Sequence, residues 1–237
     1  MTTTQAPTKD YRGRVHTLSR DIMTDWMAQL KEAARTPTPS AYLMISGNCV
    51  EILRCFDILP VFPEINALQL AIRKNSLPYI LKSEEIGYAS DNCAYVKADI
   101  GFTLCGGVGE NGTIPKPSLI VCNFVGCNVY IKWFEHCASM LNVPMVMIDI
   151  PFLREKTPSK DDIKYVMCQL RELIVKCEEL TGKKFDIDRL REILGYSVRA
   201  ERGWARSKEL CKNRPAPFDA YFDSINMMGP INALRGT

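Results

Sequence analysis

The sequence predicts an α/β fold with a doubly wound, mainly parallel sheet, and a helical segment that follows it. Short apolar runs alternate with helical patterns between residues 40 and 152, and beyond that point only helical patterns continue. The chain has 237 residues, of which 46% are hydrophobic and 24% charged, so it can bury a large core. Short strands separated by helices are typical of a parallel sheet covered on both faces.

Residues 1–39 are expected to form an N-terminal tail and one amphipathic helix. The first 18 or so residues are polar and are expected to lack regular structure. The segment DIMTDWMAQLKEAAR then places apolar residues at helical intervals, among them Trp26 and Leu30, until TPTPS ends the pattern.

Residues 40–152 are expected to form a flavodoxin-like or Rossmann-like domain that carries the functional site. Its strands are predicted at AYLMIS, PVF, SLIVCNF and VPMVMIDIP, and its helices at CVEILRCFDIL, EINALQLAIRKN and VYIKWFEHCASML. The glycine-rich segment CGGVGENG lacks the GK[ST] ending of a phosphate-binding loop, so it is expected to be a flexible loop.

Residues 153–237 are expected to be helical and to lead to a second α/β domain beyond the chain's last residue. Three helical patterns follow one another, at KDDIKYVMCQLRELIVKCEELTG, DIDRLREILGYSVRAERGWARSKELC and FDAYFDSINMM. Gly182 is expected to end the first of these helices, and Asp186 or Asp188 to cap the second.

Charge and hydropathy argue against two classes of partner. The net charge of +3 comes with no run of five or more Lys or Arg residues, which disfavours nucleic-acid binding. The N-terminus has no apolar core of a secretory signal, and the most apolar stretch, residues 119–131, is too short to span a bilayer. A cytoplasmic protein that binds no membrane is therefore expected.

Ten cysteines are many for a chain expected in a reducing compartment, where disulfides are rare. Some are therefore candidates for metal binding. The alternative for any one cysteine is simple packing, which is the expectation for Cys55, Cys168 and Cys177.

Two polar candidates follow predicted strands, at the edge where an open α/β sheet builds its site. Ser46, in Ser46-Gly47-Asn48, could donate a hydrogen bond to a carbonyl or phosphate group, or it could only cap the next helix. Glu64 stands at the start of a helix, where a carboxylate is also common because it complements the helix dipole.

Cys93 and Cys127 are the metal-ligand candidates, because both are expected where a strand ends and a helix begins, at a helix N-terminus that favours a thiolate. Their separation of 34 residues fits no zinc-finger spacing. Cys122 lies within a predicted strand and is expected to pack. His136 falls in mid-helix, and no Ser-His-Asp arrangement can be built with it.

These segments together resemble the benzoyl-CoA reductase and 2-hydroxyacyl-CoA dehydratase family, most of all its cluster-bearing benzoyl-CoA reductase subunits. The resemblance rests on SGN, PVFPEINALQLA, SDNCAYVKADIG, IVCNFVGCNVYIKWFEHCA and VPMVMIDIPF, in that order. It implies a 4Fe-4S cluster held by three cysteines, two of which fall on Cys93 and Cys127, with the third expected beyond Thr237. It also implies that Ser46 and Glu64 lie near the cluster and the thioester substrate, as carbonyl-binding and proton-relaying groups.

The same resemblance implies the reaction and the partners. In the family a separate ATPase activator drives single low-potential electrons into the cluster, and an acyl-CoA accepts them as a ketyl-type radical anion. The partners implied are an aromatic acyl-CoA substrate, a homologous cluster-bearing subunit, ATPase activator subunits and reduced ferredoxin. The reductase branch is preferred, and the alternative is a subunit of a radical 2-hydroxyacyl-CoA dehydratase. Outside the family, the alternative is a non-catalytic flavodoxin-like binding module.

Overall fold

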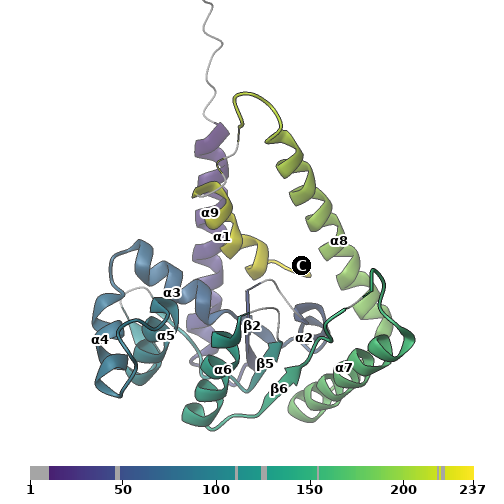
Figure 1. Ribbon diagram of the computed structural model, residues 1–237, viewed down its shortest axis with the longest axis horizontal. Coiled ribbons are helices and arrows are strands. Elements are labelled where there is room, and N and C mark those ends of the chain that lie inside the picture. The colour runs from purple at the N-terminus through teal and green to yellow at the C-terminus, as the bar shows by residue number, and fades with distance from the viewer. Residues whose placement is uncertain are drawn as a thin grey trace, which may run out of the picture.

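A parallel sheet of four strands, in the order β2-β1-β5-β6, forms the centre of the molecule (Figure 1). The computed structural model describes residues 11–45, 49–109, 112–123, 127–153, 155–217, 219 and 222–237. The strands are β1 (Ser40–Leu43), β2 (Leu59–Val61), β5 (Leu119–Asn123) and β6 (Met145–Ile148). Because every pairing is parallel, all four carboxyl ends lie at one edge of the sheet.

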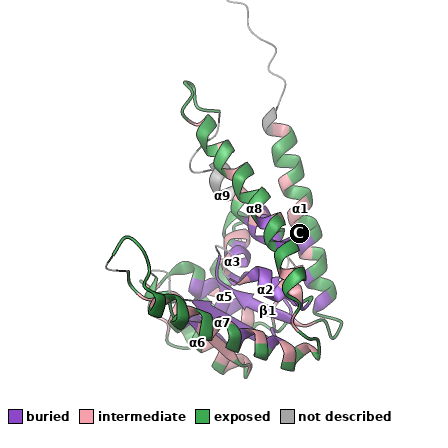
Figure 2. Cartoon of the chain, turned by 90° about the vertical axis from the view of Figure 1, so that its right-hand side faces the viewer, coloured by how far each residue is buried: buried purple, intermediate pink, exposed green. Residues whose placement is uncertain are grey.

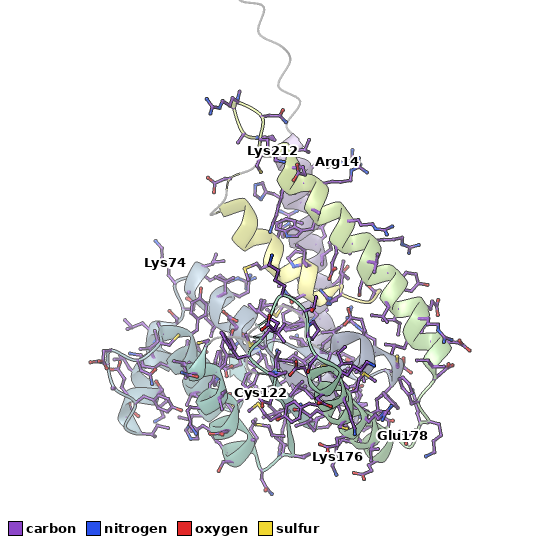
Figure 3. All side chains as sticks on the ribbon, turned by 45° about the vertical axis from the view of Figure 1, so that its right-hand side comes forward. Arg14, Lys74, Cys122, Lys176, Glu178 and Lys212 are labelled. Atoms are coloured by element: carbon purple, nitrogen blue, oxygen red, sulfur yellow. The ribbon has the colours of Figure 1, made fainter. Side chains whose placement is uncertain are left out.

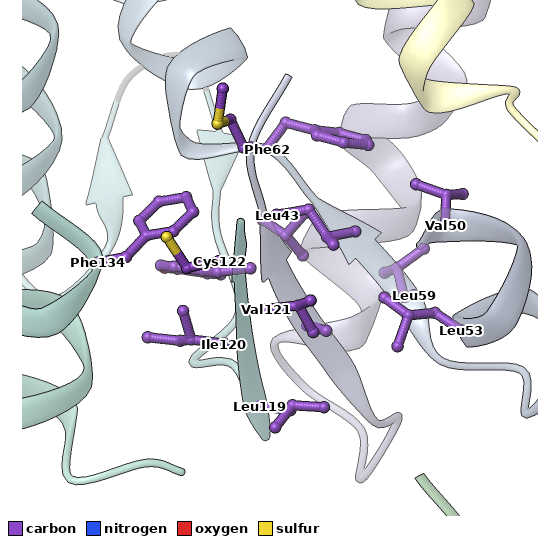
Figure 4. Close-up of a cluster of buried hydrophobic side chains, with 14 of the residues drawn as sticks. Leu43, Val50, Leu53, Leu59, Phe62, Leu119, Ile120, Val121, Cys122 and Phe134 are labelled. Carbon is purple, nitrogen blue, oxygen red and sulfur yellow. The ribbon is translucent and has the colours of Figure 1, made fainter. Parts of the chain in front are cut away.

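The two central strands are buried on both faces, as their continuous apolar sequences predict. In Figure 4 the side chains of β5 alternate, so that Ile120 and Cys122 point to one face and Leu119 and Val121 to the other. Phe134 packs on the first of these faces.

Helices cover both faces of the sheet. Phe134, from α6 (Asn128–Leu141), and Val50 and Leu53, from α2 (Val50–Cys55), lie on opposite sides of it (Figure 4). The helix α7 (Lys160–Thr181) packs on the edge strand β6. The predicted doubly wound α/β fold is thereby confirmed.

Three further helices form a cluster beside the sheet: α3 (Pro63–Ile72), α4 (Leu77–Glu85) and α5 (Ala94–Leu104). The helices α4 and α5 pack closely because Gly101 has no side chain. A Cβ atom there would stand 1.8 Å from the carbonyl oxygen of Tyr79. No helix was predicted at α4 from the sequence.

The remaining helices extend away from the sheet: α1 (Tyr11–Ala33), α8 (Ile187–Leu210) and α9 (Phe222–Ala233). The helix α9 returns alongside α1, and α8 packs on α2 (Figure 1). Figure 2 shows the buried residues concentrated around the sheet and exposed residues along α8. In Figure 3, Arg14 near the start of α1 and Lys212 just past α8 both lie far from Cys122 in the sheet.

The C-terminal residues are held against α2 by a group of polar contacts. Arg54 donates from Nη2 to the Ala233 carbonyl at 2.7 Å and from Nε to the Arg235 carbonyl at 3.3 Å. Arg235 in turn binds the buried Glu51 at 2.7 Å and Glu201 of α8 at 2.8 Å. One cluster therefore joins α2, α8 and the end of α9.

Two local predictions differ from the structure. The helix α1 begins at Tyr11, although residues up to about 18 were expected to lack regular structure. Further along, α1 packs beside α9, where Met23 lies against Gly229, a tertiary contact that local sequence does not reveal. The glycine-rich segment contains a two-stranded antiparallel hairpin, β3 (Val108–Gly109) and β4 (Gly112–Thr113), rather than an irregular loop.

The predicted helix ends of the C-terminal region agree with the structure. Gly182, at φ 70°, ends α7, and the Asp186 side chain caps α8 by accepting from the amides of Asp188 and Arg189. Among the described residues, no helix is both long enough and apolar enough to cross a membrane.

The cysteines expected to pack divide into two groups. Cys122 and Cys177 are buried, as expected, and Cys55 is half-buried. Cys168 is exposed on α7, so the expectation that it packs in the core was wrong. The α7 face that meets the protein carries Leu173 and Cys177 instead.

Candidate functional site

The carboxyl edge of the sheet gathers three of the four predicted site segments. The chain leaves β1 toward Ser46, β2 toward Glu64 and β5 toward Cys127. These strands are neighbours in the sheet, with β1 between the other two. Ser46 itself lies outside the described residues. The N-cap position of the helix that follows it, α2, is held by Cys49 in a left-handed conformation with φ 65°.

Cys93 and Cys127 are each the N-cap residue of a helix. Cys127 follows β5, as expected, but Cys93 follows the helix α4, so its predicted position at a strand end was wrong. Cys93 precedes α5 and Cys127 precedes α6, both thiols are exposed, and neither makes a side-chain cap hydrogen bond. The backbone amide of Cys93 is held by the side chain of Asn92 at 2.7 Å. Exposed thiols at helix N-termini are accessible to a metal ion.

Glu64 lies in the first turn of α3, directly after Pro63 at the helix start. The side chain is half-buried and has no hydrogen-bond or ion-pair partner among the residues that the structure describes. Burial raises the pKa of this carboxyl from 4.5 to about 7. A carboxyl with that pKa can both donate and accept a proton near neutral pH.

Two asparagines near this edge have buried polar atoms without partners in the described part of the chain. They are Asn66 Nδ2, in α3, and Asn123 Oδ1, at the end of β5. Buried amide groups are usually hydrogen-bonded, so atoms left unpaired beside strand ends are typical of a site that receives another group. Neither was predicted from the sequence. Asn66 could have been noticed as an amide on the apolar face of its helix.

Behind the two cysteines lies a buried polar network that was also not predicted from the sequence. Asp99 of α5 is 1% exposed and accepts a hydrogen bond from Trp133 Nε1 of α6 at 2.8 Å. Cys137 Sγ lies 3.9 Å from the same carboxylate oxygen. Burial raises the pKa of Asp99 to about 7, although both of these hydrogen bonds act in the opposite direction. Burial, followed by the charges of Asp99 and Cys137, raises the pKa of Tyr42 well above its usual range.

The residues present fit part of an iron-sulfur site. Two exposed thiols at helix N-termini are suitable ligands for a 4Fe-4S cluster, which is held by cysteine thiolates. Within the described ranges, no group of three or more His, Cys, Asp or Glu side chains is arranged to hold a metal ion.

Comparison with known proteins gives the family. The family described as "2-hydroxyglutaryl-CoA dehydratase, D-component" matches residues 46–235. The chain belongs to this family. The match includes all four predicted site residues, and it confirms the resemblance inferred from the sequence motifs.

Named relatives of the family include both reductase and dehydratase subunits. The chain is 40% identical over 196 residues to a benzoyl-CoA reductase subunit of Thauera aromatica, covering 81% of this chain and 45% of that protein. It is 35% identical over 187 residues to the (R)-phenyllactyl-CoA dehydratase alpha subunit of Clostridium sporogenes, covering 79% and 46%. The chain therefore spans about half the length of these curated relatives, which are subunits of acyl-CoA reductases or dehydratases.

Proposed function

We propose that this chain is part of the iron-sulfur subunit of an ATP-dependent benzoyl-CoA reductase. In this role it passes low-potential electrons to an aromatic acyl-CoA thioester and dearomatises the ring. The observation that carries the proposal is the pair of exposed cysteines, Cys93 and Cys127, at the N-caps of α5 and α6. Membership of the family supports a role for this pair in acyl-CoA chemistry.

Cys93 and Cys127 supply two thiolate ligands of a 4Fe-4S cluster in this proposal, and the third cysteine comes from a segment beyond Thr237. The relatives are about twice as long as this chain, which leaves room for such a segment in the whole protein. When bound, a cluster of this type supplies electrons at low potential. Both thiols are exposed at helix N-termini and are therefore accessible to the cluster.

Glu64 relays a proton to the reacting acyl group in this proposal. Its raised pKa of about 7 supports the role, because a proton donor works best when its pKa lies near the operating pH. Ser46, three residues after β1 in the sequence, donates a hydrogen bond to the thioester carbonyl oxygen. Such a donor stabilises negative charge that develops on the oxygen during electron transfer.

The proposed assembly contains a homologous cluster-bearing subunit, ATPase activator subunits and reduced ferredoxin as the electron donor, in the cytoplasm. This assembly is supported by the names of the relatives, because both the reductase relative and the dehydratase relative are named as subunits. A radical 2-hydroxyacyl-CoA dehydratase is the second candidate, favoured by the family's description and by the dehydratase relative. The reductase is preferred because the reductase relative has the higher identity, 40% against 35%.

Turnover by the assembled complex separates the two candidates. The anaerobic complex, with the full-length subunit, is incubated with ATP, a strong reductant and either benzoyl-CoA or a 2-hydroxyacyl-CoA such as phenyllactyl-CoA. We expect ATP-dependent loss of benzoyl-CoA and formation of a cyclic dienoyl-CoA. Turnover of the hydroxyacyl compound alone would reject the reductase in favour of the dehydratase.

Iron analysis of cysteine variants tests the ligands directly. Cys93→Ser and Cys127→Ser are expected to lower the iron and sulfide content of the anaerobically purified complex. Cys168→Ser is the matched control, because Cys168 is also exposed but lies in the middle of α7. Equal iron content in all three variants would reject Cys93 and Cys127 as ligands.

A further inference from the structure

The two helices that begin at Cys93 and Cys127 are joined by a buried hydrogen bond. Trp133 Nε1 of α6 donates to Asp99 Oδ2 of α5 at 2.8 Å, and these two residues are 2% and 1% exposed. A hydrogen bond to a buried carboxyl group is stronger than one between neutral exposed groups, and water does not compete for it.

The hydrogen bond lies at the same distance from the N-terminus of each helix. Asp99 is the sixth residue after Cys93, and Trp133 is the sixth after Cys127. At a rise of 1.5 Å per residue, each cysteine is therefore about 9 Å along its helix from the contact. If one helix tilted by about 10° about this contact, its cysteine would move by about 1.6 Å.

A second bridge connects α6 with the segment that leads into Cys93. Tyr88 Oη is hydrogen-bonded to His136 Nδ1 of α6, and the two rings stack with centroids 5.6 Å apart. Lys97 of α5 also binds this segment. Its Nζ donates to the Ser90 carbonyl at 2.6 Å and pairs with Glu84 at 2.7 Å.

The two helices otherwise pack on different parts of the molecule. The helix α5 packs on α3 and α4, with Gly101 against the backbone of α4. The helix α6 packs on the sheet, where Phe134 covers Ile120 and Cys122 of β5 (Figure 4). Movement between the helix cluster and the sheet would therefore separate the two cysteines, unless a direct link opposed it.

We infer that Asp99 and Trp133 are positioning residues that set the separation of Cys93 and Cys127. The inference rests on the proposed function in one respect, namely that the two cysteines serve one cluster. A cubane cluster needs its ligands placed to within a fraction of an ångström, so a displacement of more than 1 Å would impair its binding.

The separation can be measured in the full chain without iron. Nitroxide spin labels are attached to Cys93 and Cys127, and dipolar EPR gives the distribution of distances between them. The buried cysteines 122, 137 and 177 remain in place. The other exposed or half-buried cysteines are replaced by alanine: Cys49, Cys55, Cys105, Cys168 and Cys211.

Two tryptophan variants give a matched comparison. Trp133→Phe removes the N–H group that binds Asp99, whereas Trp26→Phe makes the same chemical change where the buried Nε1 has no partner in the described part of the chain. We expect Trp133→Phe to shift or widen the distance distribution by about 1–2 Å. Trp26→Phe should leave it as in the parent chain.

A pair of Asp99 variants tests the same bond from its other side and serves if Trp133→Phe fails to fold. Asp99→Asn keeps an oxygen that accepts from Trp133 and should preserve the distribution. Asp99→Leu removes that acceptor and should widen it. Equal distributions in the parent, Trp133→Phe and Asp99→Leu, or equal widening in Trp26→Phe, would overturn the inference.

The assembled complex separates failure of this inference from failure of the proposed function. There, Trp133→Phe should lose iron to a chelator about 10-fold faster than Trp26→Phe, a loss typical of residues that support metal ligands. If Trp133→Phe widens the distance distribution but the assembled complex contains no iron, the cluster is rejected and the positioning role is retained. An unchanged distribution in a complex that holds iron normally would reject the positioning role alone.

Discussion

Asp99→Asn should make the protein more stable at alkaline pH than the parent chain. The parent carries a carboxyl that is 1% exposed and whose pKa burial raises from 3.8 to about 7. Above pH 7 this group is ionised inside the protein, which is unfavourable. Asparagine is nearly the same size, cannot ionise, and keeps an oxygen for the Trp133 N–H.

The magnitude follows from the two pKa values. Between pH 3.8 and about pH 7 the folded chain holds a proton on Asp99 that the unfolded chain has released, so the free energy of unfolding falls as pH rises. At about 1.4 kcal/mol for each pH unit, the total loss is on the order of 4 kcal/mol. Below the unfolded pKa, and again above the folded pKa, the contribution no longer changes with pH.

Urea unfolding followed by circular dichroism, at several values between about pH 4.5 and pH 8, measures this contribution. The free energy of unfolding of Asp99→Asn minus that of the parent should rise across the range by about 3–4 kcal/mol and level off above about pH 7. Asp91→Asn, which alters an exposed carboxyl in the segment before α5, should stay within about 0.5 kcal/mol of the parent. A difference between Asp99→Asn and the parent that does not vary with pH would refute the reasoning.

Three further predictions concern packing, an ion pair and the proposed proton relay. Gly101→Ala should lower the free energy of unfolding by about 3 kcal/mol, because its Cβ would stand 1.8 Å from a backbone oxygen, whereas Gly203→Ala, in open space on α8, should raise it by about 0.5 kcal/mol. Equal effects in thermal melts would contradict the assigned close approach. Arg235→Ala should lower the free energy of unfolding by about 2 kcal/mol, because it leaves Glu51 buried without its ion-pair partner; the loss is limited because Arg235 is partly exposed to solvent. An unchanged urea midpoint would be inconsistent with this. Glu64→Gln should reduce kcat/KM of the assembled complex by about 10²-fold and should remove the fall in activity that the parent shows above about pH 7. If the variant still loses activity above that pH, another group causes the fall.

The sheet could be predicted from the sequence because its strands are short, apolar and separated by clear helical patterns. AYLMIS and SLIVCNF correspond to β1 and β5, and their burial on both faces explains their lack of alternation. Gly182 and Asp186 could be placed for local reasons too, since helix ends depend on a few neighbouring residues. The segments of Glu64 and Cys127 reach the site edge as a direct consequence of the parallel sheet.

What the sequence did not reveal depends on contacts between distant segments. The first turns of α1 are polar and mostly exposed, and the contact between α1 and α9 joins segments about 200 residues apart. In the sequence, Asp99 looks like an ordinary polar residue. Only the structure shows its contact with Trp133, 34 positions away. Cys168 was expected in the core because cysteine is a common small core residue, but it lies on the exposed side of α7.

The polar contacts between α2 and the C-terminal residues have a consequence for how the protein is made. Arg54 and Glu51 find their partners 179 to 184 positions later, at residues 233 and 235. At a synthesis rate of about 5–20 residues per second, the ribosome needs about 10–40 s to make that intervening chain. During this interval α2, which begins four residues after Ser46 in the sequence, lacks these contacts. The segment nearest one predicted substrate-binding group should therefore be among the last to become native in the newly made chain.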